Sequence, residues 1–194
     1  MKIIRTLIYS LYLLTLPIGA IARTTVDSAI DEDSQRSDSI VANYLKGTGI
    51  ETTDNNSVKL LMSGHDKFVD MFECISNAKS FVHLEYFNFR NDSIAGLLFN
   101  ILTQKANEGV EVRALYDDFG NWSNNQPIKK VQHDSINDLG VKLVKFDPLK
   151  FPYVNHIIPR DHRKIVVVDG KVAYTGGMNV ADYYIEGIEG IGPW

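Results

Sequence analysis

One stretch decides the fold prediction: His162-Arg-Lys-Ile-Val-Val-Val-Asp-Gly-Lys-Val-Ala-Tyr-Thr-Gly-Gly-Met-Asn179. Its apolar run, residues 165–168, is typical of a central strand that is buried on both faces of a sheet. Asp169-Gly170 then predicts a two-residue hairpin turn, after which residues 171–175 return as a paired strand. We therefore expect a hairpin within a sheet, followed by a turn of small residues, Gly176-Gly177, that leads to Asn179.

Upstream of this stretch, helix-like and strand-like patterns alternate. Phe68, Met71 and Ile75 recur at helical spacing after Ser63, a favourable N-cap residue. We expect further strands at residues 57–62, 81–87, 110–117 and 141–146. A helix is expected at residues 94–102, with Asp92 or Ser93 at its start and Gly109 as its stop signal, and a weaker helix at residues 127–139. Strands that alternate with helices predict an α/β layered domain.

Composition limits the possible functions. The chain has 194 residues, 44% of them hydrophobic, which is enough to bury the core of one domain. Its formal net charge of −4 argues against a nucleic-acid partner that is bound through global positive charge. Residues 142–171, around the quoted stretch, nevertheless carry seven basic and three acidic side chains. Cys74 is the single cysteine, so neither an intrachain disulfide nor a Cys-based zinc site is possible.

The first 56 residues have a different character. Lys2 and Arg5 precede an uncharged run that ends in Ala20-x-Ala22, so we expect a signal peptide at residues 1–22; an uncleaved membrane anchor is the alternative. Residues 23–56 predict an acidic linker or arm, in which residues 40–45 could form a short helix. A folded domain is expected at residues 57–194, and the leader predicts a protein that is exported or anchored in a membrane.

His162, Lys164 and Asp169 fit the pattern H-x-K-x4-D, and Asn179 follows at a short distance. Residues two apart on a strand project to the same side, so an imidazole and an ammonium can converge on one phosphate group. Cleavage of a phosphodiester needs a nucleophile and neutralised non-bridging oxygens, which these residue types supply. Asp169 has a second interpretation, because Asp-Gly turns are common without any chemical role.

The stretch 162–179 resembles the first catalytic motif of bacterial cardiolipin synthases of the phospholipase D superfamily. His83-Leu-Glu-Tyr-Phe87 with Phe89, the run from Glu108 to Asp117, and Phe151-Pro152 match the same family, so the resemblance covers about residues 57–194. It implies a phospholipase D-like layered domain, in which α-helices flank a mixed β-sheet. This domain would form the N-terminal half of a two-domain pseudo-dimer.

The resemblance also implies a reaction that needs no metal and no cofactor. A motif histidine attacks phosphatidylglycerol to give a phosphohistidine, and a second phosphatidylglycerol then takes over the phosphatidyl group. His162 would be the nucleophile or its acid/base partner, and Lys164 and Asn179 would hold phosphate oxygens. Gly177 and Glu85 are possible supporting residues, although Glu85 could equally be a charge that is paired near the sheet end. The implied partners are an anionic phospholipid and a membrane surface. The resemblance further implies that residues 57–194 form the catalytic domain and that the protein belongs to the cell envelope, exported to the periplasm or anchored in the bacterial inner membrane.

The family has two such motifs in one chain, whereas this sequence contains one. No histidine follows His162, and His65, His83, His133 and His156 lack the motif context, so we interpret them as loop, surface or core residues. We expect that the chain is truncated after Trp194 and that its partner is a second motif-bearing half or a second copy. The alternatives are a homodimeric single-motif phosphodiesterase, either a nuclease or a phospholipase D, and an inactive fragment.

Basic and aromatic residues near the motif suggest two weaker lipid contacts. Five cations could attract anionic headgroups or could form a solvated face: Lys142, Lys145, Lys150, Arg160 and Arg163. Residues 151–153, Phe-Pro-Tyr, could touch acyl chains or could simply pack within their loop.

Overall fold

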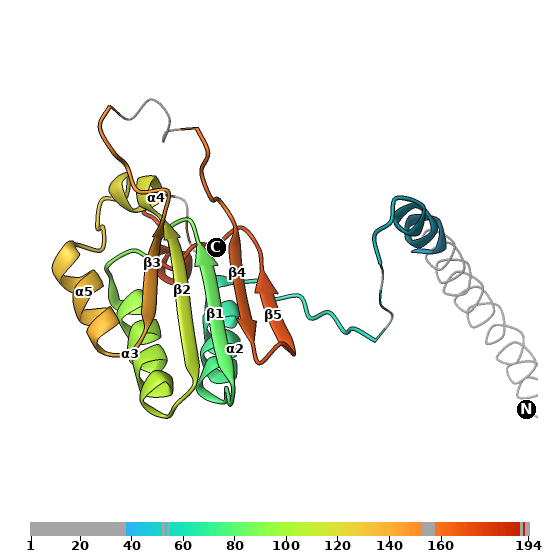
Figure 1. Ribbon diagram of the computed structural model, residues 1–194, viewed down its shortest axis with the longest axis horizontal. Helices are drawn as coiled ribbons and strands as arrows, with labels where there is room; N and C mark the ends of the chain where they lie inside the picture. Colours follow the sequence, from blue (N-terminus) through green and yellow to red (C-terminus); the bar gives the residue numbers. More distant parts are fainter. Residues whose placement is uncertain (1–37, 52, 54, 153–157, 191, 193–194) are drawn as a thin grey trace, which may run out of the picture. The chain divides into compact units, whose positions relative to one another are not determined.

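The computed structural model describes residues 38–51, 53, 55–152, 158–190 and 192 (Figure 1). The chain divides into two compact units, Met1–Val58 and Lys59–Trp194. In the first unit residues 38–47 are helical, as the apolar residues 40–45 predicted. The predicted signal peptide or anchor lies outside the described residues. Within the part of the chain that is described, no helix is long and apolar enough to cross a membrane.

The second unit is built on a five-stranded mixed sheet with the order β3-β2-β1-β4-β5 (Figure 1). The strands are β1 (Phe81–Tyr86), β2 (Glu111–Asp117), β3 (Lys142–Phe146), β4 (Lys164–Val168) and β5 (Val172–Thr175). β1, β2 and β3 are parallel, whereas β4 is antiparallel to both β1 and β5. The predicted α/β domain with a mixed sheet is therefore confirmed.

Helices connect the strands, and α2 and α3 begin at the N-cap residues that the sequence predicted. They are α2 (Gly64–Ser76), α3 (Ser93–Asn107), α4 (Asp118–Trp122), α5 (Lys130–Asp138) and α6 (Tyr183–Glu186). The Ser63 hydroxyl accepts a hydrogen bond from the Asp66 N–H at 3.0 Å, and the Asp92 carboxylate accepts one from the Ala95 N–H at 3.3 Å. Both side chains thus satisfy an otherwise unpaired donor in the first turn of a helix.

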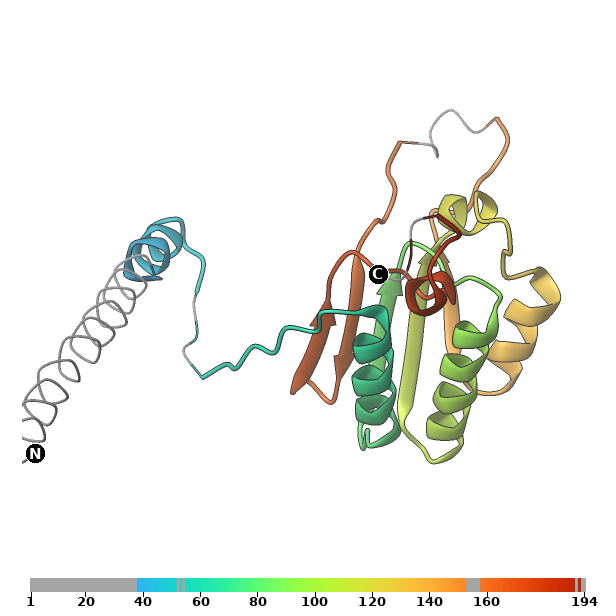
Figure 2. The same cartoon turned by 180° about the vertical axis from the view of Figure 1, so that it is seen from behind.

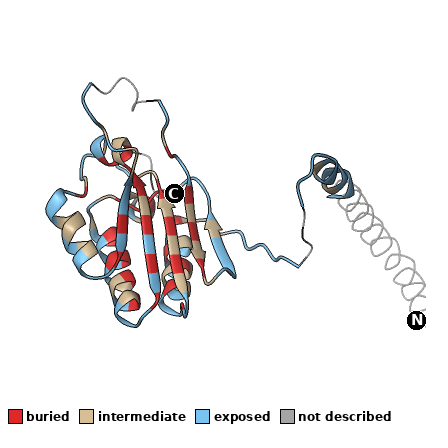
Figure 3. Cartoon of the chain, viewed as in Figure 1, coloured by how far each residue is buried: buried red, intermediate tan, exposed pale blue. Residues whose placement is uncertain are grey.

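The core lies between one face of the sheet and helices α2 and α3, which cover that face in Figure 2. Along β1, Val82, Leu84 and Tyr86 are buried and the alternate residues are only partly buried, a pattern that Figure 3 shows across the sheet. Ile165 and Val167 of β4 are also only partly buried. The prediction that residues 165–168 are buried on both faces was therefore wrong for one face, because no described helix covers it.

The predicted strand at residues 57–62 is also wrong. Within the described residues this segment pairs with no strand, and Val58, Leu60 and Met62 are 95%, 78% and 75% exposed. Apolar alternation alone does not make a strand, because a strand needs a neighbour to pair its backbone groups. Likewise the helix expected from residue 127 begins only at Lys130, and Pro127 and Ile128 belong to the preceding loop.

The hairpin between β4 and β5 is confirmed. Asp169 and Gly170 have φ angles of 53° and 66°, and the Lys171 N–H donates to the Val168 carbonyl at 3.0 Å. Positive φ at both central residues defines a type I′ turn, whose twist matches that of the flanking strands.

We predict that Gly170→Ala lowers the free energy of unfolding by about 1 kcal/mol, because alanine is strained in the left-handed region. Gly96→Ala is the matched control: Gly96 lies within α3, an added Cβ there meets nothing within 4 Å, and alanine should stabilise the helix by roughly 0.5–1 kcal/mol. Urea unfolding of both variants measures the difference. Equal effects would contradict the turn assignment.

Candidate active site

The motif lies at the edge of the sheet where the parallel strands end. Lys164, the first residue of β4, pairs with Tyr86, the last residue of β1. Because β4 runs antiparallel to β1, the residues that precede β4 lie at the carboxyl ends of the parallel strands. That edge is the usual ligand-binding edge of an open α/β sheet.

His162 and Lys164 meet at this edge around the ring of Phe87. The exposed His162 imidazole packs edge-on against that ring, with centroids 4.8 Å apart. The Lys164 ammonium lies 5.4 Å from the Phe87 centroid and donates to the His162 carbonyl at 2.7 Å. Burial lowers the pKa of Lys164, and the nearby Asp161 carboxylate partly opposes this effect. The structure thus brings together the two residues that the pattern predicted as partners.

Asn179 joins the same region from the turn after β5. It is 8% exposed, and its side-chain oxygen accepts a hydrogen bond from the Asn88 N–H at 3.4 Å. Asn88 follows Phe87 directly, so this bond ties the Asn179 side chain to the backbone next to the ring that contacts His162.

Lys67 of α2 is a site residue that the sequence did not reveal. Its ammonium donates to the carbonyls of Met178 at 2.9 Å and Asn179 at 3.4 Å, and lies 5.3 Å from the Tyr86 centroid. Its pKa falls to about 7, first because of burial and second because of repulsion by the Lys164 ammonium. Within the described residues neither ammonium forms an ion pair with a carboxylate. The two ammonium groups are near enough to interact electrostatically, and two such cations suit an anion.

One local signal for Lys67 existed. It lies four residues before the buried Met71, so helical spacing places it on the apolar face of α2 rather than in solvent. Its partners are 111 and 112 residues away in the sequence, and no local pattern predicts such a contact.

A buried carboxylate holds the residues that lead into the motif. Asp117, at the end of β2, is 0% exposed and accepts hydrogen bonds from the Asp161 N–H at 2.8 Å, from the Arg160 guanidinium at 3.2 Å and from the Gly120 N–H at 2.9 Å. Arg160 also pairs with Asp147. Asp117 therefore fixes the backbone immediately before His162, a role that its sequence context did not indicate.

Glu85 lies beside the motif through Arg163. The Arg163 guanidinium is 3.5 Å from Glu85 and 3.7 Å from Asp161. The pKa of Glu85 is raised by burial and by the Asp161 carboxylate. Glu85 is thus close to residues on both sides of His162, but no hydrogen bond joins it to the imidazole. His83 on the same strand face pairs with Glu111 instead, at 2.7 Å.

Asp169 lies at the opposite end of β4 from Lys164. Its carboxylate accepts three backbone hydrogen bonds, from Lys79, Ser80 and Phe81, at 2.9, 2.8 and 3.0 Å. These hydrogen bonds lower the pKa of Asp169, and the bond from the Ser80 N–H has the largest effect. The structure therefore does not bring Asp169 together with His162, and its contacts favour a structural role.

The remaining residues of interest are dispersed. An added Cβ at Gly177 would meet nothing within 4 Å, so the space above this glycine is open. Of the five cations, Lys145, Arg160 and Arg163 form ion pairs with Asp118, Asp117 and Glu85 respectively, while Lys142 and Lys150 are exposed. His156 and Tyr153 lie outside the described residues. In the described part of the chain no three His, Cys, Asp or Glu residues gather in a way that could hold a metal ion.

We predict that Asp169→Asn lowers the urea midpoint at pH 7. Because the folded-state pKa of Asp169 is depressed, its stabilisation is present above the unfolded value of about 4 and is lost as the pH falls through the folded value. The difference between wild type and variant should shrink below about pH 4. Asp138→Asn, at the exposed end of α5, is the control. A pH-independent difference would contradict the role of the carboxylate charge.

Comparison with known proteins identifies the family. The sequence model described as "Cardiolipin synthase, PLD-like domain" matches residues 71–187. Cardiolipin synthase from Alkalihalophilus pseudofirmus is 37% identical over 132 residues, 68% of this chain and 25% of the relative. The probable cardiolipin synthase YwiE of Bacillus subtilis is 35% identical over 153 residues, 77% of this chain and 29% of the relative. The chain thus spans about a quarter of the length of these relatives.

Solved structures of lower similarity also match. The phospholipase D family member Nuc from Salmonella typhimurium has a TM-score of 0.45 at 23% identity, covering 59% of this chain and 65% of its own. NucT from Helicobacter pylori has a TM-score of 0.46 at 20% identity, covering 61% and 70%. Since the family model matches more than half of the sequence, the chain belongs to the family of cardiolipin synthase PLD-like domains.

Proposed function

We propose that this chain forms one half-site of a phosphatidyltransferase of the cardiolipin synthase type, acting on phosphatidylglycerol at the surface of the cell envelope. The observation that carries the proposal is that the exposed His162 imidazole and the Lys164 ammonium both contact the Phe87 ring, while the Lys67 ammonium lies near enough to Lys164 for its pKa to be lowered. Neither ammonium forms an ion pair with a carboxylate within the described residues. An imidazole can attack phosphorus, and the ammonium groups can neutralise the non-bridging oxygens. Family membership supports the same chemistry.

The reaction has two steps. In the first, neutral His162 attacks phosphorus, a P–N bond forms, and the P–O bond to the glycerol headgroup breaks. The departing glycerol oxygen must receive a proton. In the second step a hydroxyl of another phosphatidylglycerol attacks the phosphohistidine and gives its proton to the group that protonated the glycerol. A P–O bond forms, the P–N bond breaks, and cardiolipin leaves with His162 free again. Lys164, Lys67 and Asn179 would hold the phosphate oxygens in both steps.

His162 cannot protonate the leaving glycerol in the step in which it forms the P–N bond. A second acid is therefore required. His83 pairs with Glu111, and the His133 ring lies against Tyr116 at 6.1 Å, so neither occupies the site. Among the described histidines none contacts His162, and we propose that a second histidine from another motif-bearing half or from a second copy of this chain supplies this acid. The alternative is that two copies of the same half-site form a homodimeric phosphodiesterase, either a nuclease or a phospholipase D.

We predict that His162→Ala lowers turnover of phosphatidylglycerol by at least about 10³-fold, because it removes the nucleophile. His65→Ala, at an exposed histidine on α2, should leave turnover unchanged. Activity is measured beside oligomeric state by light scattering. A dimer that cleaves bis(p-nitrophenyl) phosphate but leaves phosphatidylglycerol intact favours the phosphodiesterase. A variant that retains full activity would contradict the proposed nucleophile.

A second prediction concerns the charge of Lys67. Because its pKa is about 7, its positive charge is present at pH 6 and largely lost at pH 8, so affinity for an anion should fall over this range. We expect Lys67→Met to weaken binding of diphenyl phosphate by about tenfold at pH 6 and to flatten the pH dependence. Lys67→Arg should bind well at both pH values, since arginine stays charged.

Calorimetry in the His162→Ala background measures this binding without cleavage and without titration of that imidazole. The phosphodiester keeps one negative charge throughout the pH range, so any change in affinity comes from the protein. A pH dependence that is the same with lysine, methionine and arginine at position 67 would rule out the proposed contribution of this ammonium.

A further inference from the structure

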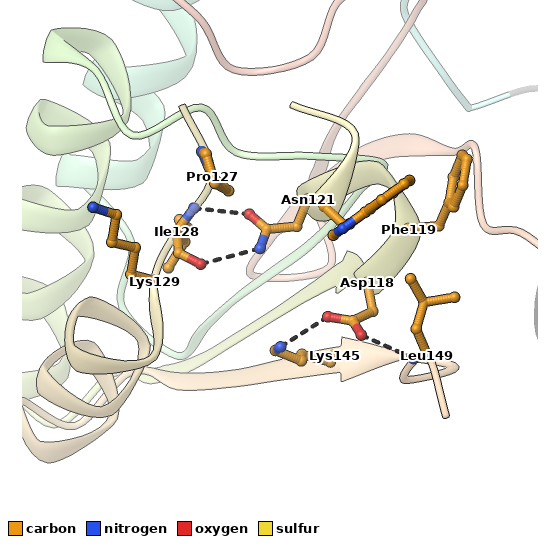
Figure 4. Close-up of a pocket in the computed structure, with 9 residues that line it drawn as sticks. Asp118, Phe119, Asn121, Pro127, Ile128, Lys129, Lys145 and Leu149 are labelled. Atoms are coloured by element: carbon orange, nitrogen blue, oxygen red, sulfur yellow. Dashed lines mark hydrogen bonds and ion pairs between the residues drawn. The ribbon is translucent and has the colours of Figure 1, made fainter. Parts of the chain in front are cut away.

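A groove near the motif is lined mainly by apolar side chains (Figure 4). Its volume is about 670 Å³, within the range of roughly 300–1,000 Å³ that sites for small molecules occupy. It lies between α4, the loop before α5 and the loop after β3. These three segments supply its apolar side chains, which are Phe119, Trp122, Pro127, Ile128 and Leu149.

The polar side chains of the groove already have partners. Asp118 pairs with Lys145 at 2.8 Å and accepts a hydrogen bond from the Leu149 N–H at 2.9 Å. The Asn121 amide donates to the Ile128 carbonyl at 3.0 Å and accepts from the Ile128 N–H at 2.8 Å, as the dashed lines in Figure 4 show. A ligand therefore finds apolar contact here and few open hydrogen-bonding groups, which suits a hydrocarbon chain better than a sugar or a base.

The rim of the groove combines an aromatic ring with a cation. Trp122 is 69% exposed, a high value for a side chain that gains much free energy from burial. Lys129 is also exposed and lies at the opposite end of the groove from Phe119 in Figure 4. An apolar slot with an aromatic ring at its exposed rim matches the hydrocarbon part of an amphipathic molecule, whose polar part stays outside the slot.

Close packing links the groove to His162. Gly120 lies between Phe119 and Asn121 on α4, and a Cβ added there would come within 2.2 Å of the Phe87 carbonyl oxygen and 2.9 Å of the Phe87 ring. The same ring packs against the His162 imidazole at 4.8 Å. Phe87 and one turn of helix therefore connect the groove to the motif. Gly120 permits this approach because it has no side chain.

We propose that the groove binds one acyl chain of the diacyl phospholipid whose phosphate reacts at His162. The inference rests on the proposed function and adds a site for the apolar part of the substrate. A single glycerol unit joins phosphate and acyl chains in a phospholipid, so sites for the two parts must lie close together, as this groove and His162 do.

Tryptophan fluorescence tests the proposal directly. The sequence has two tryptophans, Trp122 and Trp194, so Trp194→Phe leaves Trp122 as the single reporter. The probe is phosphatidylglycerol brominated along its acyl chains and kept below its micelle concentration, because bromine quenches tryptophan only at contact range. We expect saturable quenching of Trp122, and the same quenching when His162→Ala is added.

Two matched variants separate the groove from general surface binding. Leu149→Lys should weaken the saturable quenching by about tenfold, since burial of one leucine side chain contributes about that factor. Leu97→Lys makes the same exchange on α3, where the leucine is 53% exposed and outside the groove, and should change nothing. Circular dichroism confirms that both variants are folded.

Quenching that does not saturate, or that Leu149→Lys leaves unchanged, would overturn the acyl-chain site. So would a Trp122 that is shielded from both lipid and acrylamide in a dimer, because a second copy would then cover the groove. Saturable quenching without turnover of phosphatidylglycerol supports the groove and counts against the proposed function alone. Turnover without quenching overturns the groove alone.

Discussion

The antiparallel pairing of β4 with β1 is the constraint on which the candidate site depends. Its register sets Lys164 opposite Tyr86, and so brings His162 to the edge where the parallel strands end. Asp169 supports this register from the other end of β4, because its carboxylate accepts three backbone hydrogen bonds from residues 79–81 at the start of β1. Within the motif, Asp169 and Lys164 thus lie at opposite ends of β4.

Charge is distributed unevenly around that edge. Asp117 and Asp147 form ion pairs with Arg160, whereas the ammonium groups of Lys67 and Lys164 donate to backbone carbonyls and form no ion pair among the described residues. The Asp161 carboxylate affects Lys164 only from beyond ion-pair distance. Burial of an uncompensated cation is costly, which is why the pKa values of both lysines fall. A bound phosphate would relieve this cost. The arrangement of these two lysines therefore favours an anionic ligand.

Local signals predicted much of the fold, and long-range contacts explain what they missed. The Ser63 and Asp92 caps and the Asp169-Gly170 turn are set within three or four residues, so the sequence pattern was sufficient for them. The contacts of Lys67 and Asp117 join segments far apart in the chain, and no local pattern indicates them. The strand prediction for residues 57–62 was wrong for the same reason. A strand depends on a neighbouring strand, and the sequence of the segment itself does not specify that neighbour.

The groove beside α4 would hold the apolar part of a lipid substrate, but the proposed chemistry depends first on the anion site at Lys164 and His162. A crystal soaked with tungstate, a heavy tetrahedral anion, tests it without requiring turnover. We predict a tungsten peak within hydrogen-bonding distance of the Lys164 ammonium and the His162 imidazole. Tungstate bound elsewhere on the surface, with Lys164 and His162 empty, would contradict the proposed half-site.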